Sequence, residues 1–275
     1  MILNKSKFSY QPPENGYPEW NNNPDIFQLN RLPAHAMAIP HTTKEGALTF
    51  QEATSIYYKS LNGDWKFYFS ERPSEKLKGF EAIDFDTSKW EAIKVPAHWQ
   101  LQGYDYPQYV NTRYPWIEHD EIQPPHAPTN YNPVGQYVTN FETPEEWGKQ
   151  PVILHFAGVE AAFYVWVNGE LVGYSEDTFT QAEFNITPYL NQHGENKLAV
   201  EVYRWADASW LEDQDFWRLS GIFRDVYLYS LPKLHVYDHR VRTYFDSEYK
   251  DATLEVKTDV VNYFKDTFDS SQLEV

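Results

Sequence analysis

Apolar and polar positions alternate along most of the chain from about residue 46 onward. Short runs rich in β-branched and aromatic residues, such as 163–167 (FYVWV) and 198–203 (LAVEVY), are separated by turn residues. Asn168 and Gly169 follow the first of these runs, at a place where a tight turn needs residues that tolerate positive φ. The pattern therefore predicts antiparallel strands joined by hairpins.

No segment of convincing length has the 3.6-residue period of an amphipathic helix, which disfavours a parallel sheet with crossover helices. The predicted fold class is all-β, a two-sheet antiparallel sandwich or jelly roll that occupies residues 46–231. Residues 1–45 are rich in Pro, Asn and His and have no sustained period. We interpret them as an extended N-terminal arm.

Beyond Leu231 the alternation starts again. Residues 252–260 place Ala252, Leu254 and Val256 on one face of a strand. The segment 232–275 has only about forty residues, which is too short to close a β-sandwich of its own. We expect it to be the incomplete beginning of a further strand-rich domain that another stretch of polypeptide completes.

Charge and composition narrow the set of partners. The 275 residues include 23 Lys and Arg against 40 Asp and Glu, a formal net charge of −17 that disfavours nucleic acid and anionic membranes. The chain has no Cys, which excludes disulfides and a thiolate nucleophile. No secretory signal or run of membrane-spanning length is visible, so we expect a cytoplasmic protein. Aromatic residues make up 17%, which suggests a ligand with flat apolar faces.

Two segments concentrate side chains that suit sugar binding. Within residues 204–226, Asp207 lies near Trp205 and Trp210 in the sequence. A carboxylate flanked by aromatic rings is typical of a group that binds a sugar hydroxyl or a hard cation. Residues 95–116 form a Pro-interrupted loop rich in Tyr, Trp and Asn, whose amides can exchange hydrogen bonds with hydroxyl groups. The alternative to sugar binding is that most of these rings fill the interior of the sandwich.

The carboxylates of the first segment also have a structural interpretation. Asp213 or Asp215 paired with Arg218 or Arg224 would staple a buried turn, because buried charges require partners. Glu212 and Asp215 could in principle form a local hydrolytic pair. We expect that they do not, because the neighbouring arginines would lower both pKa values and leave no proton donor at neutral pH.

Several longer motifs together resemble one family. They are NPDIFQLNRLPAH (23–35), YVNTRYP (109–115), FAGVEAAFYVWVNG (156–169) and SWLEDQDFWRLSGIFRDV (209–226). The combination resembles the amino-terminal part of the bacterial lactose-cleaving β-galactosidases of glycoside hydrolase family two. The resemblance implies an arm, a jelly-roll sugar-binding domain and the start of an immunoglobulin-like domain at 232–275.

The resemblance also implies roles for particular residues. The asparagine of the YVNTRYP loop maps onto Asn111 and implies a contact with galactose. The aspartate of the Arg-Trp-x-Asp-x-Ser segment maps onto Asp207, which implies contacts with galactosyl hydroxyls and with an active-site sodium ion. Some members carry a peripheral Mg²⁺ site in addition to magnesium near the catalytic centre; Asn23 matches one peripheral ligand, and Glu176 stands where relatives can carry Gln.

The catalytic groups are implied to lie elsewhere. Retaining hydrolysis needs two carboxylates about 5–5.5 Å apart, and in the family both glutamates lie on a TIM barrel that follows the second domain. We expect this chain to bind β-galactosides within a homo-oligomeric β-galactosidase, together with that enzyme's remaining domains, and to be inactive alone. The alternatives are a related β-glucuronidase or β-mannosidase, and a non-catalytic carbohydrate-binding module.

Overall fold

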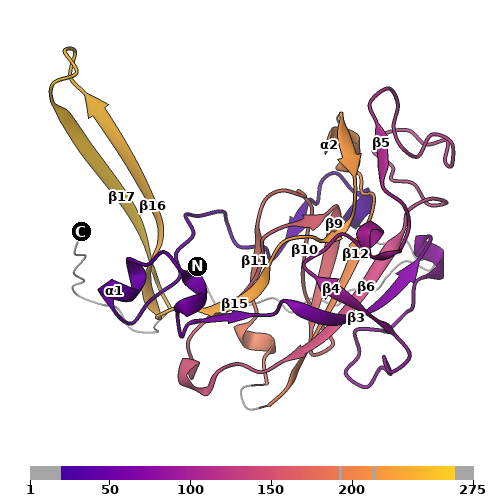
Figure 1. Cartoon of the computed structure of the whole chain (residues 1–275), viewed down its shortest axis with the longest axis horizontal. Coiled ribbons are helices and arrows are strands. Elements are labelled where there is room, and N and C mark those ends of the chain that lie inside the picture. The colour runs from indigo at the N-terminus through magenta and orange to yellow at the C-terminus, as the bar shows by residue number, and fades with distance from the viewer. Residues whose placement is uncertain (1–19, 192–193, 213–214, 264–275) are drawn as a thin grey trace.

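The computed structural model describes residues 20–191, 194–212 and 215–263. Two antiparallel sheets pack face to face in the body of the molecule (Figure 1). The larger sheet has the order β1-β10-β9-β12-β6-β3-β4, and the smaller has the order β11-β7-β15-β2. The predicted all-β sandwich is confirmed.

The larger sheet consists of β1 (Gln28–Leu29), β3 (Gly63–Ser70), β4 (Glu91–Val95), β6 (Val134–Phe141), β9 (Ala162–Val167), β10 (Glu170–Ser175) and β12 (Asn196–Tyr203). The smaller consists of β2 (Tyr58–Ser60), β7 (Val152–Phe156), β11 (Ala182–Asn185) and β15 (Val226–Ser230). Three further pairs join β5 (Gln108–Val110) to β13 (Phe216–Arg218), β8 (Val159–Glu160) to β14 (Gly221–Ile222), and β16 (Leu234–Phe245) to β17 (Ala252–Asn262).

Helical segments are short. The α-helices are α1 (Lys44–Ala47) and α2 (Ser209–Glu212), and the 3-10 helices are η1 (Trp20–Asn22), η2 (Glu52–Thr54), η3 (Pro73–Glu75), η4 (Trp99–Gln102), η5 (Glu145–Trp147) and η6 (Thr187–Tyr189). None of the helices in the described part of the chain is long and apolar enough to cross a membrane.

The hairpin between β9 and β10 forms where the sequence predicts it. Asn168 and Gly169 link the strands and have φ values of 53° and 79°. Positive φ at both positions matches the twist of a two-residue turn to that of the strands. Asn168 also donates from its side chain to the Tyr189 carbonyl at 2.8 Å, which ties the turn to the body.

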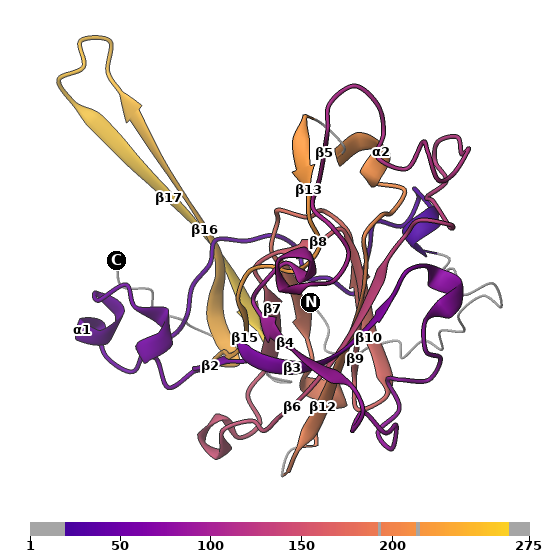
Figure 2. The same cartoon turned by 45° about the vertical axis from the view of Figure 1, so that its right-hand side comes forward.

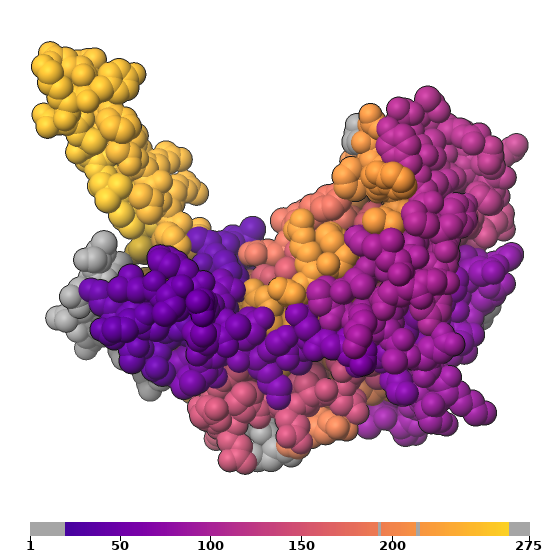
Figure 3. Space-filling model, viewed as in Figure 1, coloured from indigo at the N-terminus to yellow at the C-terminus, as the bar shows by residue number. Residues whose placement is uncertain are grey.

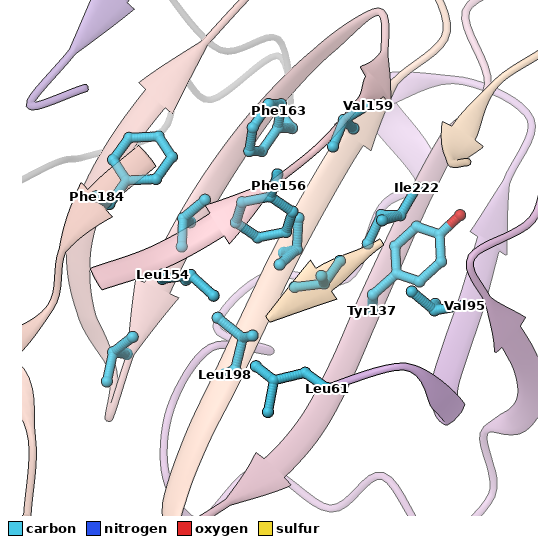
Figure 4. Close-up of a cluster of buried hydrophobic side chains, with 14 of the residues drawn as sticks. Leu61, Val95, Tyr137, Leu154, Phe156, Val159, Phe163, Phe184, Leu198 and Ile222 are labelled. Carbon is cyan, nitrogen blue, oxygen red and sulfur yellow. The ribbon is translucent and has the colours of Figure 1, made fainter. Parts of the chain in front are cut away.

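The core lies between the two sheets. Figure 4 shows Leu154 and Phe156 of β7 close to Leu198 of β12 and Phe163 of β9. A second apolar cluster, which includes Phe80, Trp90, Tyr164 and Trp166, covers the outer face of the larger sheet. Every residue of β9 and β12 is therefore buried, including the polar residues of β12. These two strands are covered on both faces rather than half exposed.

The described part of the arm lies along the sandwich. Its strand β1 pairs with the edge strand β10, and Trp20 stacks on Tyr164 with ring centroids 5.5 Å apart. At the other end of the chain, β16 and β17 form a long hairpin that projects from the body (Figure 3). Residues 1–19 of the predicted arm and 264–275 of the predicted third domain lie outside the described residues. The predicted domain limits stay a prediction.

Candidate functional site

Asp207 lies in the turn between β12 and α2. The turn is closed by the Ala206 N–H, which donates to Ser209 Oγ at 3.0 Å, and by the Trp210 N–H, which donates to the Asp207 carbonyl at 3.2 Å. The Asp207 N–H donates to the carbonyl of Asn21 in the arm at 3.1 Å. These contacts hold the carboxylate in a site where only 6% of the residue is exposed.

One oxygen of this carboxylate lacks a hydrogen-bond donor. Asp207 Oδ1 is buried and has no hydrogen-bond partner within the described residues. The Glu176 carboxyl hydrogen-bonds Asp207, and burial raises the pKa of Asp207 and raises that of Glu176 to about 9. Glu176 therefore carries a proton at neutral pH. A buried acceptor of this kind needs a donor or a cation.

The oxygen is of the chemical type that would bind the sodium ion implied by the family resemblance, since hard cations prefer carboxylate ligands. The described residues contain no group of three or more His, Asp or Glu placed to hold a metal, so Asp207 would supply one ligand among others. The predicted magnesium residues fit less well. Asn23 Oδ1 accepts from the Asp25 N–H at 3.2 Å, and Glu176 Oε1 accepts from the Tyr174 hydroxyl.

Asn111 follows strand β5 and is exposed. Strands β5 and β13 form a two-stranded ribbon that rises from the body beside α2 (Figure 2). Within this ribbon Tyr109 faces Trp217 across the strands, with ring centroids 5.6 Å apart. The Asn111 side chain hydrogen-bonds Tyr109, whose hydroxyl donates to Asp215 Oδ1.

The loops that carry Asn111 and Asp207 pack against each other. The Tyr114 hydroxyl donates to the Trp210 carbonyl at 3.1 Å, and the two ring centroids are 4.4 Å apart. Trp116 is buried with its ring centroid 5.4 Å from that of Trp205 and 5.0 Å from that of Trp210. The two segments that the sequence singled out therefore form one aromatic junction.

The rings of residues 95–116 divide between core and surface. Trp99 belongs to the core between the sheets, whereas Tyr106 and Tyr109 are 47% and 48% exposed. On the neighbouring strand β13, Trp217 is 58% exposed. The half-exposed rings of the ribbon are free to offer an apolar face to a ligand.

The expected lowering of the Glu212 pKa is wrong, because burial raises it. Glu212 Oε2 accepts from Thr178 Oγ1 at 3.2 Å, whereas Asp215 bonds Tyr109. The two carboxylates thus have separate partners. Of the arginines considered as staples for this turn, Arg224 donates to the Phe179 carbonyl at 3.0 Å, and Asp213 lies outside the described residues.

Sequence reasoning missed two buried charged residues beside the site. Burial raises the pKa of Glu160 to about 8, although Arg204 and Arg218 lie close enough to oppose the shift. Arg204 is buried and forms an ion pair with Asp105. The position of Arg204 directly after a strand of buried residues was the available signal, since an arginine there must find acceptors.

A family model and two curated relatives match this chain to glycoside hydrolases. The family model described as "Glycosyl hydrolases family 2, sugar binding domain" matches residues 58–232. A protein named beta-galactosidase from Priestia megaterium is 61% identical over 265 residues, which are 96% of this chain and 26% of that protein. A beta-galactosidase large subunit from Leuconostoc lactis is 39% identical, and the match covers 88% of this chain and 40% of that subunit.

Among solved structures, the chain is similar to the Bacteroides uniformis beta-glucuronidase, with a TM-score of 0.57 and 26% identity. That likeness covers 74% of this chain and 22% of the other. The chain spans about a quarter of the length of the first curated relatives that it matches.

Proposed function

The chain belongs to glycosyl hydrolase family 2 through its sugar binding domain, and from this premise we propose that it is the sugar-binding portion of a retaining β-galactosidase. In this proposal, Asp207 accepts hydrogen bonds from galactosyl hydroxyls and ligates a sodium ion, and Asn111 contributes an amide from the adjoining loop. Parts of the enzyme outside this chain supply the two catalytic carboxylates.

The observation that carries the proposal is the unpartnered Asp207 Oδ1. A buried carboxylate oxygen without a donor costs free energy unless a ligand satisfies it. Trp205 and Trp210 lie two residues before and three residues after Asp207 in the chain, and the aromatic junction connects this turn to the loop of Asn111. An acidic acceptor, an amide and apolar ring faces are the groups that bind hexoses.

Asp207→Asn in the complete enzyme tests the proposal. The substitution keeps the shape of the side chain but removes the negative charge, so we expect weaker galactoside affinity and loss of sodium dependence. Unchanged KM and unchanged activation by sodium would exclude Asp207 from the site.

Asp120→Asn is the matched control. Asp120 is also buried, but its oxygens accept from the N–H groups of Asn130 at 3.0 Å and Tyr131 at 3.1 Å, and from Asn130 Nδ2 at 2.8 Å. Its substitution is expected to lower stability and to leave galactoside affinity and sodium dependence as they are.

We further propose that the active protein contains additional domains or subunits and is a cytoplasmic homo-oligomer. The relative named as a large subunit supports the first part. The isolated chain is expected to show no turnover of a chromogenic β-galactoside and at most weak galactose binding by calorimetry. Turnover comparable to that of a complete hydrolase would contradict the proposal.

A β-glucuronidase is the second candidate, because solved structures with this fold carry that name. Sequence identity favours the galactosidase, at 61% against 26%. Parallel assays of the complete enzyme with chromogenic β-galactoside and β-glucuronide distinguish the two.

A further inference from the structure

We propose that Arg204 is the positioning residue that fixes the ribbon β5–β13, and with it Asn111, relative to Asp207. The inference rests on the proposed function, because it concerns how the two halves of that site are held together. Arg204 follows β12 directly and lies three residues before Asp207. Its side chain is fully buried.

The guanidinium binds both strands of the ribbon at their root. Arg204 Nη2 donates to Gln108 Oε1 at 3.4 Å and to the Arg218 carbonyl at 3.2 Å. Gln108 begins β5, Arg218 ends β13, and the two residues are register partners. A single side chain therefore binds both members of the pair that closes the ribbon.

The same group also holds the segment that leads into β5. Arg204 Nη1 forms an ion pair with Asp105 and donates to the Tyr106 carbonyl at 3.2 Å. The Asp105 side chain is only 4% exposed, so solvent does not screen the pair. Neither charge can lose its partner without leaving the other buried and unpaired.

Two aromatic rings fix the guanidinium in turn. Its central carbon lies 4.9 Å from the Trp205 ring centroid and 5.4 Å from that of Tyr131. The planar fork of an arginine can bind several acceptors at once, whereas the ammonium group of a lysine acts as a point charge. The contact thus links the Asp207 side of the site to the ribbon with a defined geometry.

The ribbon needs such an anchor. Among the residues that the structure describes, three pairs join β5 to β13, and an isolated two-stranded ribbon of this length is marginally stable in water. The Tyr114–Trp210 contact holds the loop beyond Asn111, and Arg204 holds the root before it. Loss of the Arg204 contacts is expected to loosen the ribbon while the sandwich stays folded.

The experiment compares Arg204→Gln and Asp105→Asn with the control Lys76→Gln in the complete enzyme. Lys76 Nζ pairs with Glu201 Oε1 at 2.7 Å, with both side chains buried, and Glu201 lies on β12 three residues before Arg204. All three variants thus disturb a buried ion pair near the end of β12. Asp105→Asn is the milder change. If Arg204→Gln does not fold, the result for Asp105→Asn alone tests the inference.

Amide hydrogen exchange measured by mass spectrometry is the first readout. In Arg204→Gln and Asp105→Asn, peptides that contain 108–110 and 216–218 should exchange at least tenfold faster than in the unchanged enzyme. Peptides from β7 should keep their protection. Unchanged exchange of the ribbon in both variants, or equal acceleration in Lys76→Gln, would overturn the inference.

Steady-state kinetics with a chromogenic β-galactoside are the second readout. A displaced Asn111 weakens binding of substrate and transition state alike, so KM should rise at least fivefold while kcat changes less than twofold. Arg204→Lys should not restore KM. Lys76→Gln should lower Tm and leave KM unchanged.

The two readouts separate the two proposals. Faster ribbon exchange with an unchanged KM would support the role of Arg204 in holding the ribbon. It would also exclude Asn111 from substrate binding, and in that respect the proposed function would fail. A raised KM with unchanged ribbon exchange would contradict the anchor itself.

Discussion

His35 Nε2 lies 2.6 Å from Glu183 Oε2, although the two residues are 148 positions apart in the chain. The other ring nitrogen, Nδ1, lies 2.9 Å from the Ala36 carbonyl oxygen. Carboxylate and carbonyl oxygens only accept, so the protonated ring can donate from both nitrogens, and the hydrogen bond to Glu183 raises the pKa of His35. An ion pair with little exposure thus joins the arm to β11.

Three parts of the molecule meet at this ion pair. Glu183 also accepts from His155 Nδ1 on β7 at 2.8 Å and from the Tyr229 hydroxyl on β15 at 2.9 Å. The His35 ring lies 4.4 Å from that of Tyr237 on β16, where Asp238 accepts from the Ala36 N–H at 2.8 Å. The His35–Glu183 pair therefore stabilises the contacts of arm, sandwich and projecting hairpin together.

The pair should make stability depend on pH in two directions. The hydrogen bond to Glu183 raises the pKa of His35, so its contribution is complete below the unfolded value of about 6.5 and declines as pH rises through the raised value. Burial alone would raise the pKa of Glu183, but hydrogen bonds from His155 and His35 lower it to about 2. Its contribution is complete above about 4.5 and is lost toward pH 2.

His35→Gln should lower the free energy of unfolding by about 1–3 kcal/mol at pH 6, since it leaves a buried carboxylate with a weaker partner. It should also flatten the fall in stability between pH 6.5 and 9, as measured by urea denaturation at several pH values. His239→Gln, at an exposed position of β16, is the control and should keep the slope. An equal slope in the His35 variant would contradict the assignment.

Gly173→Ala should displace the arm from the edge of the larger sheet. A Cβ atom at this position of β10 would lie 2.4 Å from the Leu29 carbonyl oxygen and 2.6 Å from the Phe184 ring. Neither group can move freely, because Leu29 pairs with β10 and Phe184 is fully buried in the core. We expect a loss of about 1–3 kcal/mol.

Thermal unfolding and hydrogen exchange of a peptide that contains β1 test this prediction. Gly46→Ala in the exposed helix α1 is the control, because its new Cβ meets only the His41 and Thr43 side chains at 3.3 Å. That variant should change stability by less than about 1 kcal/mol. A Gly173 variant as stable as the control would show that the contact with β1 is not tight.

The local pattern of the sequence predicted those features of the fold that depend on residues adjacent in the chain. Alternation and the Asn168-Gly169 turn predicted the β9–β10 hairpin correctly, because both are properties of consecutive positions. The same pattern predicted a strand at 198–203, which β12 confirms, but it carried no information about what covers the polar residue of that strand. Glu201 is buried because Lys76, from a segment 125 residues earlier, covers it and forms an ion pair with it.

The site shows the same division. The chemistry of Asp207 and Asn111 could be inferred from residue types and from motif resemblance, whereas the Arg204 anchor could not. Arg204 and Asp105 are 99 positions apart, and a periodic pattern carries no information about such partners. The charged pairs at Arg204 and at His35 had to be read from the structure.

Trp217→Ala should separate ligand binding from stability. The Trp217 ring is 58% exposed, so its removal should cost less than about 1 kcal/mol of folding free energy. It packs beside Tyr109, which lies two residues before Asn111, and the proposed function assigns its exposed face to the galactoside. Loss of that face should weaken galactoside affinity about five- to twentyfold, the equivalent of about 1–2 kcal/mol.

Competitive inhibition of the complete enzyme by galactosides measures the affinity, and urea denaturation measures the stability. Tyr249→Ala removes a ring that is 81% exposed, in the loop between β16 and β17. That loop lies far from β5 in the fold (Figure 1). It should leave both quantities unchanged. If the Trp217 variant bound galactosides as tightly as this control, the ribbon would contribute its amide alone, and the exposed rings would need a different partner.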